Sequence, residues 1–185
     1  MKVKGITFIT RKQGIINKFG ENRWEEFIKN FSKEDSYFAD NLILASTWIP
    51  AEHFLKFNDA VNNEFYGGDN SILWELGKDA ADFALKEDGP YEVFVKNKDI
   101  KTFTDNYVSM IWNSHFSDGY MSAKFDGIKV DIIVSGLPLV HDYFEFLVMG
   151  YSKRAYEVVS GKNVKLNKIF DQDPNSAYHY EVIFL

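Results

Sequence analysis

The spacing of apolar residues divides the chain into a helical first part and a strand-rich last part. Five stretches before residue 113 repeat apolar side chains every three or four positions, which predicts amphipathic helices. Asn22, followed by Glu25, predicts the N-cap of the second helix, and Pro50 predicts the first turn of the third. The predicted helices cover residues 5–19, 22–31, 50–65, 71–86 and 100–112.

After residue 113 the apolar period changes to that of strands. Residues 120–125 and 128–132 flank Asp126-Gly127, which predicts a β-hairpin with a two-residue turn. A long helix follows and ends before Gly161. Residues 164–166 and 178–184 alternate on either side of residues 171–175, which predicts a second hairpin. The apolar stripe of the long helix is Val140, Phe144, Leu147, Tyr151, Ala155 and Val158.

This order of elements predicts an α+β fold. Helices come first, and the β-β-α-β-β order of the last part indicates a four-stranded antiparallel sheet packed on helices. No repeat, low-complexity tract or linker divides the 185 residues, so we expect one domain. Within it, residues 1–116 are expected to be mainly helical, and residues 117–185 to form the sheet with its long helix.

Composition removes several classes of function. The chain has no cysteine, which excludes disulfides, thiolate nucleophiles and cysteine-ligated metals. Its net charge of -6 argues against nucleic acid as a partner. No apolar run reaches the ~18–20 residues that span a bilayer, and no apolar signal-peptide core follows the first residues. We therefore expect a cytoplasmic protein.

Histidine is the scarcest reactive side chain, and His115 is the most informative of the four. It lies four residues after Ile111 and eight after Tyr107, so a continuing helix would place all three on one face. There His115 could bind a heme iron, or it could be a helix-end histidine that bonds backbone or water. His179 has no partner within reach in the sequence, and His53 can pair with polar neighbours.

The other motifs indicate neither catalysis nor a metal. His141 and Glu145 have the spacing of an exposed pair on a helix. The chain has no nucleophile elbow, no His-Glu-x-x-His helix and no phosphate-binding loop, since residues 67–70 lack the required lysine. Residues 171–175 do not continue into a calcium loop. We expect no enzyme activity and no metal site.

Both ends of the chain resemble a known superfamily. Lys18-Phe-Gly-Glu-Asn-Arg-Trp24 is similar to the junction between the first two helices of heme-NO/oxygen-binding (H-NOX) domains. Ser135-Gly136-Leu137, the long helix and the closing strand resemble the end of H-NOX and four-vinyl-reductase-type domains. The middle, around residues 73–81, looks like an uncharacterised bacterial family of similar length. The resemblance implies a helical part and a sheet that enclose a cavity.

The heme motif of that superfamily does not match. Heme-binding members carry Tyr-x-Ser-x-Arg, which holds the heme propionates, and alignment on residues 135–137 places Val130, Ile132 and Val134 there. These side chains neither donate to nor neutralise a carboxylate. His115 falls a few residues after the position of the axial ligand. The resemblance therefore implies the fold without heme or another cofactor.

The sequence favours a non-enzymatic sensory or adaptor module that binds a small apolar ligand or a protein partner. Core packing is the competing interpretation of the residues that would line a cavity. Two further alternatives are a heme-based NO/O2 sensor with His115 as the axial ligand, and a scaffolding homodimer. The candidate ligand-binding residues are Phe103, Tyr107, Ile111, Val140, Phe144 and Leu147.

Overall fold

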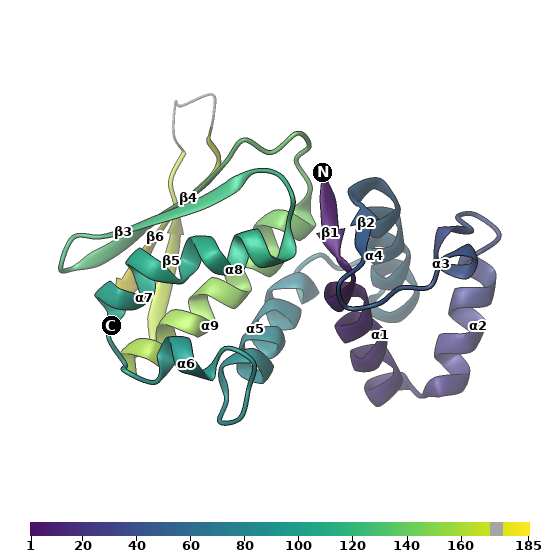
Figure 1. The fold of residues 1–185 in the computed structure, drawn as a ribbon, viewed down its shortest axis with the longest axis horizontal. Helices are drawn as coiled ribbons and strands as arrows, with labels where there is room; N and C mark the ends of the chain where they lie inside the picture. The colour runs from purple at the N-terminus through teal and green to yellow at the C-terminus, as the bar shows by residue number, and fades with distance from the viewer. Residues whose placement is uncertain (171–175) are drawn as a thin grey trace. The chain divides into compact units, whose positions relative to one another are not determined.

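The computed structural model describes residues 1–170 and 176–185, and the chain forms two compact units (Figure 1). The first unit comprises Met1–Asp69 with Ser114–Ser117, and the second comprises Asn70–Asn113 with Asp118–Leu185. The helices between residues 70 and 113 therefore group with the sheet.

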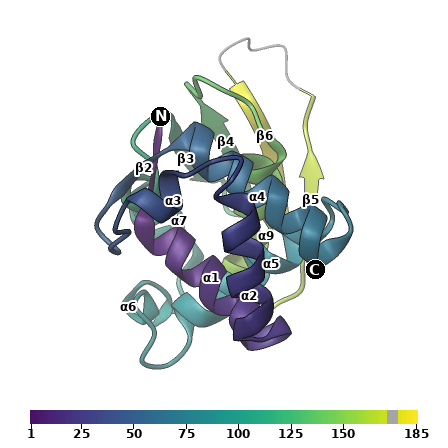
Figure 2. The same ribbon diagram turned by 90° about the vertical axis from the view of Figure 1, so that its right-hand side faces the viewer.

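The first unit is a small helical bundle with a two-stranded sheet. Strand β1 pairs antiparallel with β2, with Val3 opposite Ile49, and α1, α2 and α4 pack together (Figure 2). Aromatic side chains form its core, where the rings of Phe8 and Phe38 stack at 4.6 Å. Its elements are β1 (Lys2–Lys4), α1 (Gly5–Phe19), α2 (Glu21–Phe31), α3 (Tyr37–Asp40), β2 (Trp48–Pro50) and α4 (Ala51–Tyr66).

The start of α2 corrects one prediction. The helix begins at Glu21 with Gly20 as its N-cap, so the capping role predicted for Asn22 is wrong. Gly20 has a φ of 92°, a left-handed value that glycine adopts without steric cost. One residue therefore ends α1 and starts α2.

The second unit contains the predicted β-β-α-β-β arrangement. Its sheet is antiparallel with the strand order β3-β4-β6-β5, which confirms the expected α+β fold. Helix α8 ends in the short segment assigned to the first unit. The elements are α5 (Ile72–Leu85), α6 (Glu92–Val95), α7 (Ile100–Asn106), α8 (Val108–His115), β3 (Tyr120–Phe125), β4 (Lys129–Ser135), η1 (Tyr143–Leu147), α9 (Val148–Ser160), β5 (Val164–Lys168) and β6 (Ser176–Phe184).

The two faces of this sheet differ in chemistry because strand side chains alternate. On β4, the inner face carries Val130, Ile132 and Val134, all buried, and α9 packs against β5 and β6. The outer face carries Lys129, Asp131 and Ile133 on the same strand. The outer face of the sheet is therefore more polar than its inner face.

Helices α5 and α9 cross at unusually short range because each presents a glycine to the other. A Cβ at Gly77 would lie 2.1 Å from the carbonyl oxygen of Leu147, and a Cβ at Gly150 would lie 2.3 Å from that of Trp74. Side chains cannot be accommodated at either position without moving backbone. The absence of side chains at these two positions sets the distance between the helices.

Two predicted helices differ from the structure in detail. The helix expected over residues 100–112 is interrupted at Tyr107, which separates α7 from α8. The long helix begins at Tyr143 with one π-helical turn, so Val140 lies before it and is 70% exposed. The prediction that Val140 belongs to the buried stripe is therefore wrong. The predicted turn over residues 171–175 lies outside the described residues.

Candidate functional site

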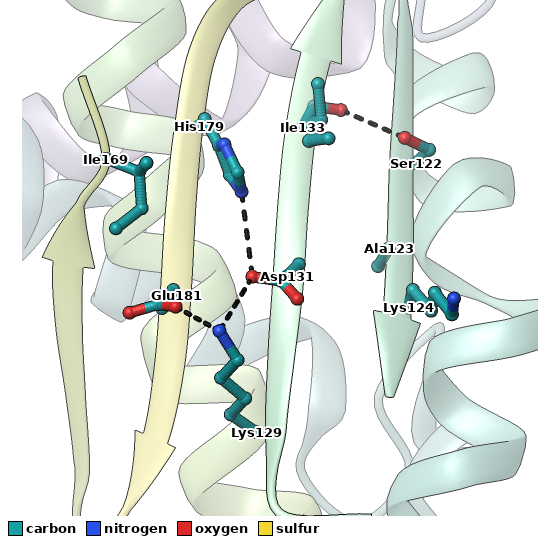
Figure 3. Close-up of a pocket in the computed structure, with 9 residues that line it drawn as sticks. All are labelled: Ser122, Ala123, Lys124, Lys129, Asp131, Ile133, Ile169, His179 and Glu181. Carbon is teal, nitrogen blue, oxygen red and sulfur yellow. Dashed lines mark hydrogen bonds and ion pairs between the residues drawn. The ribbon is translucent and has the colours of Figure 1, made fainter. Parts of the chain in front are cut away.

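A groove of about 500 Å³ lies on the outer face of the sheet (Figure 3). Three strands supply most of its lining, and the helices lie behind the sheet in this view. Polar and apolar side chains are interspersed in it, with Ile133 beside Ser122 and Ile169 beside His179. The lining residues are Ser122, Ala123, Lys124, Lys129, Asp131, Ile133, Ile169, His179 and Glu181.

Charged groups on β4 and β6 form a connected cluster on the floor of this groove. The ammonium of Lys129 lies 3.5 Å from Asp131 Oδ1 and forms an ion pair with Glu181. The bond to Glu181 contributes most to raising the pKa of Lys129 above its ordinary value. His179 Nε2 lies 3.6 Å from the same oxygen of Asp131 (Figure 3). Asp131 thus faces one cation and one titratable ring.

The strand register explains why these residues meet. Asp131 pairs with Glu181, and Ile133 pairs with His179, so all four side chains point to the outer face. His179 is only 16% exposed there. This cluster was not predictable from the sequence, because residues some 50 positions apart become neighbours only once the pairing of β4 with β6 is known. The alternation of both strands was the only signal for it.

Lys124 lies beside this cluster without joining it. It is paired with Asp131 in the β3–β4 register, a geometry that allows cross-strand ion pairs. In Figure 3, however, its side chain points away from Asp131, which faces Lys129 and His179 instead. Over residues 1–170 and 176–185, no ion pair or hydrogen bond engages the ammonium of Lys124. The lining nevertheless carries two lysines and two carboxylates, so its formal charges balance.

The six residues predicted to bind a ligand do not line this groove. Phe103 and Phe144 are buried, and Phe103 packs edge-on against Tyr156 at 5.3 Å. Tyr107 stacks on Phe94 at 4.3 Å, while Ile111 and Leu147 are half-buried and Val140 is exposed.

His115 lies near the end of α8, in the segment assigned to the first unit. Its Nδ1 is 2.9 Å from the hydroxyl oxygen of Ser114, and its ring is half-buried. The three positions aligned with the heme clamp belong to the second unit, where Val130, Ile132 and Val134 each have 0% exposure on the inner face of β4.

A second polar cluster is buried at the start of the long helix. Glu145 accepts a hydrogen bond of 2.5 Å from the hydroxyl of Tyr180 and pairs with Lys168 at 2.5 Å. Burial, followed by the bond to Glu145, raises the pKa of Tyr180. The predicted exposed pair of His141 with Glu145 is therefore wrong, because Glu145 points inward. His141 instead exchanges backbone hydrogen bonds with the hydroxyl of Tyr178.

His53 forms the polar pair that its neighbourhood predicted. Its Nδ1 lies 2.6 Å from Oδ2 of the buried Asp35, and its ring stacks on Tyr37 at 4.5 Å. Burial by itself raises the pKa of Asp35, but the hydrogen bonds from His53 and from the Tyr37 N–H outweigh it and lower that pKa overall. The pair ties the loop before α3 to α4, which is a structural role.

The described residues contain neither a metal-binding cluster nor a membrane-spanning helix. Among residues 1–170 and 176–185, no group of three or more histidine, aspartate or glutamate side chains is placed to hold a metal ion. Within the same residues, no helix is both long enough and apolar enough to cross a membrane.

Comparison with known proteins identifies the fold. No protein-family model and no curated protein matches the sequence. Among solved structures, an Fe(II) unliganded H-NOX protein from K. algicida is similar over 98% of this chain and 96% of its own, with 12% identity and a TM-score of 0.68. An H-NOX protein from S. oneidensis in the Fe(II)NO ligation state gives 98% and 99% coverage, 10% identity and a TM-score of 0.66. The chain has an H-NOX-like fold.

Proposed function

We propose that this chain is a non-enzymatic sensory or adaptor module that uses the H-NOX-like fold without heme. The observation that carries the proposal is the inner face of β4, where the three positions aligned with the heme clamp are apolar and fully buried. The similarity to H-NOX structures over 98% of the chain supports a sensory role rather than catalysis.

The chemistry of the heme propionates is the reason for excluding the cofactor. Each propionate is a carboxylate, and a carboxylate removed from water needs a cation or hydrogen-bond donors close to it. Val130, Ile132 and Val134 provide neither. Their complete burial also means that this surface is already used for packing in the second unit. The residues present therefore do not fit heme.

A heme-based gas sensor is the competing function, and one arrangement favours it. His115 Nδ1 lies 2.9 Å from the Ser114 hydroxyl, and metal-binding histidines are commonly oriented by a partner at their second nitrogen. The two H-NOX proteins compared above contain iron, one in the Fe(II) state and the other in the Fe(II)NO state.

Titration of the purified protein with hemin distinguishes the two functions. The proposal predicts only the broad absorbance of weakly adsorbed hemin, with the same titration curve for the wild type, His115→Ala and the control His141→Ala. A sharp Soret band that saturates at one equivalent and is lost only in His115→Ala would overturn the proposal in favour of the gas sensor.

A further inference from the structure

We propose that the buried carboxylate of Glu145 is a binding site for the ammonium group of an aliphatic primary amine, and that Lys168 occupies this site when no ligand is bound. The inference rests on the proposed function, because it names the ligand class of a binding module. It involves none of the three β4 positions that exclude heme, so the two can fail separately.

Glu145 provides the anionic group of the site. Its side chain is only 8% exposed, and it accepts a hydrogen bond of 2.5 Å from the Tyr180 hydroxyl. A carboxylate removed from water needs a cation close to it, because one neutral hydroxyl does not neutralise its charge. The ammonium of Lys168, 2.5 Å away, neutralises that charge in this structure. The surroundings of Glu145 therefore favour a positively charged partner.

Two aromatic rings lie beside the same ammonium. The nitrogen of Lys168 is 5.9 Å from the centroid of the Tyr178 ring and 5.8 Å from that of Phe170. Ring faces within about 6 Å attract a cation, and aromatic rings around an ammonium are a common way for proteins to recognise such ligands. Phe170 is 88% exposed, so the fold gains little from its burial and its ring is accessible to the chain of an incoming amine.

A second carboxylate strengthens the preference for a cation. Burial, the largest cause, and the charges of Glu145 and Asp142 raise the pKa of Tyr178 to about 12, which indicates that both carboxylates lie near this phenol. Asp142 accepts a hydrogen bond of 2.6 Å from the amide of Asn70, a neutral partner that leaves its charge in place. An ammonium beside Tyr178 is attracted by both charges, whereas an anion is repelled by both.

The position of Lys168 makes it a replaceable occupant of the site. It is the last residue of the edge strand β5, it pairs with Tyr180, and its side chain is 39% exposed. Water therefore reaches the four-carbon stem, and an alkyl amine of the same length fits the space that the stem fills. Lys165 on the same strand pairs with Ile183 and is exposed on the other face, so it provides a matched control.

Titration of the whole chain with n-butylammonium at constant ionic strength, followed through backbone amide NMR shifts, tests the inference. Lys168→Ala removes the internal ammonium and vacates its space. For this variant we expect shifts on β5, β6 and η1 with a dissociation constant on the order of millimolar. The wild type should bind about tenfold more weakly, as expected for a site that Lys168 fills about 90% of the time. Lys165→Ala should bind like the wild type.

One further compound and one further variant test the chemistry of the site. 1-Butanol has the same chain without the charge and should leave these amides unchanged. Adding Glu145→Gln to Lys168→Ala should weaken the binding of n-butylammonium about tenfold, because the anionic partner is lost. The amide spectrum of each variant establishes that it is folded, and the titration of the wild type requires no variant.

Three results would overturn the inference. Lys168→Ala could bind n-butylammonium no more tightly than the wild type, the double variant could bind it as tightly as Lys168→Ala, or the wild-type amides of β5, β6 and η1 could stay unchanged at about ten times the expected dissociation constant. The last result would make the pair of Lys168 with Glu145 a permanent part of the fold. None of these outcomes depends on whether hemin binds, so the failure of this site and the failure of the heme-free function are separate observations.

Discussion

Substitution of Gly77 by alanine should destabilise the second unit, because the close approach of α5 and α9 depends on this residue. The added Cβ would lie 2.1 Å from the Leu147 carbonyl oxygen and 2.8 Å from the Tyr151 nitrogen. Both are backbone atoms of the facing helical segment, so no side-chain rotation relieves the contact. The two helices have to separate.

The expected change in the free energy of unfolding of Gly77→Ala is the sum of two opposing effects. Replacing glycine by alanine inside a helix stabilises by about 0.5–1 kcal/mol, because the unfolded chain loses freedom. Overpacking costs about 1–3 kcal/mol, and a backbone displacement belongs at the upper end of that range. The net loss of unfolding free energy should be about 2 kcal/mol. Gly150→Ala should behave alike, since its Cβ would meet the Trp74 backbone at 2.3 Å.

Urea unfolding followed by tryptophan fluorescence measures this loss, and Gly14→Ala provides the matched control. Gly14 lies within α1, and a Cβ built there meets nothing within 4 Å. This control should stabilise its unit by about 0.5–1 kcal/mol. If Gly77→Ala and Gly150→Ala also stabilised the protein, the helix crossing would not be as close as described and the packing argument would be wrong.

Two further predictions concern buried carboxylates and their partners. Asp35→Asn should cost about 1–3 kcal/mol at pH 7, because it removes a charge-assisted bond to His53. Folding lowers the pKa of Asp35, so its carboxylate stabilises the fold above the ordinary pKa of 3.8, and this stabilisation is lost as the pH falls through the lower folded pKa. The difference in unfolding free energy between wild type and variant should therefore shrink at pH 3. A difference that stays constant between pH 7 and pH 3 would refute this prediction. Lys168→Met should lower the free energy of unfolding by about 1–2 kcal/mol at pH 7, because the buried Glu145 is left with only the hydrogen bond from Tyr180. The loss is moderate because the Lys168 side chain is partly exposed to water. Urea unfolding at pH 7 measures this deficit, and a variant as stable as the wild type would contradict the pairing.

Long periodic segments were predictable from the sequence. The helix over residues 5–19 and a hairpin of β3 and β4 occur as expected, because each has a clear apolar period and a nearby glycine. The predicted Asp126-Gly127 turn is wrong by one residue, since Phe125 pairs with Val130 and the turn is Gly127-Ile128. Strands β1 and β2 were not predicted. Each is three residues long, which is too short to display a period, and they are defined by pairing with each other across almost 50 residues.

The candidate site was less predictable for the same physical reason. His179 and Asp131 belong to strands whose alternation was visible, but their proximity depends on which strands pair and in what register. Val140 was misplaced because the helical period was extended into residues that precede the helix, and Glu145 turns inward with the π-helical turn that starts at Tyr143. A local pattern contains neither kind of information.

Native mass spectrometry of protein purified from cells supplied with a heme precursor tests the heme-free use of this fold most directly. The account predicts a mass without heme for both the wild type and His115→Ala. A stoichiometric adduct with the mass of heme, present in the wild type and absent from His115→Ala, would contradict it.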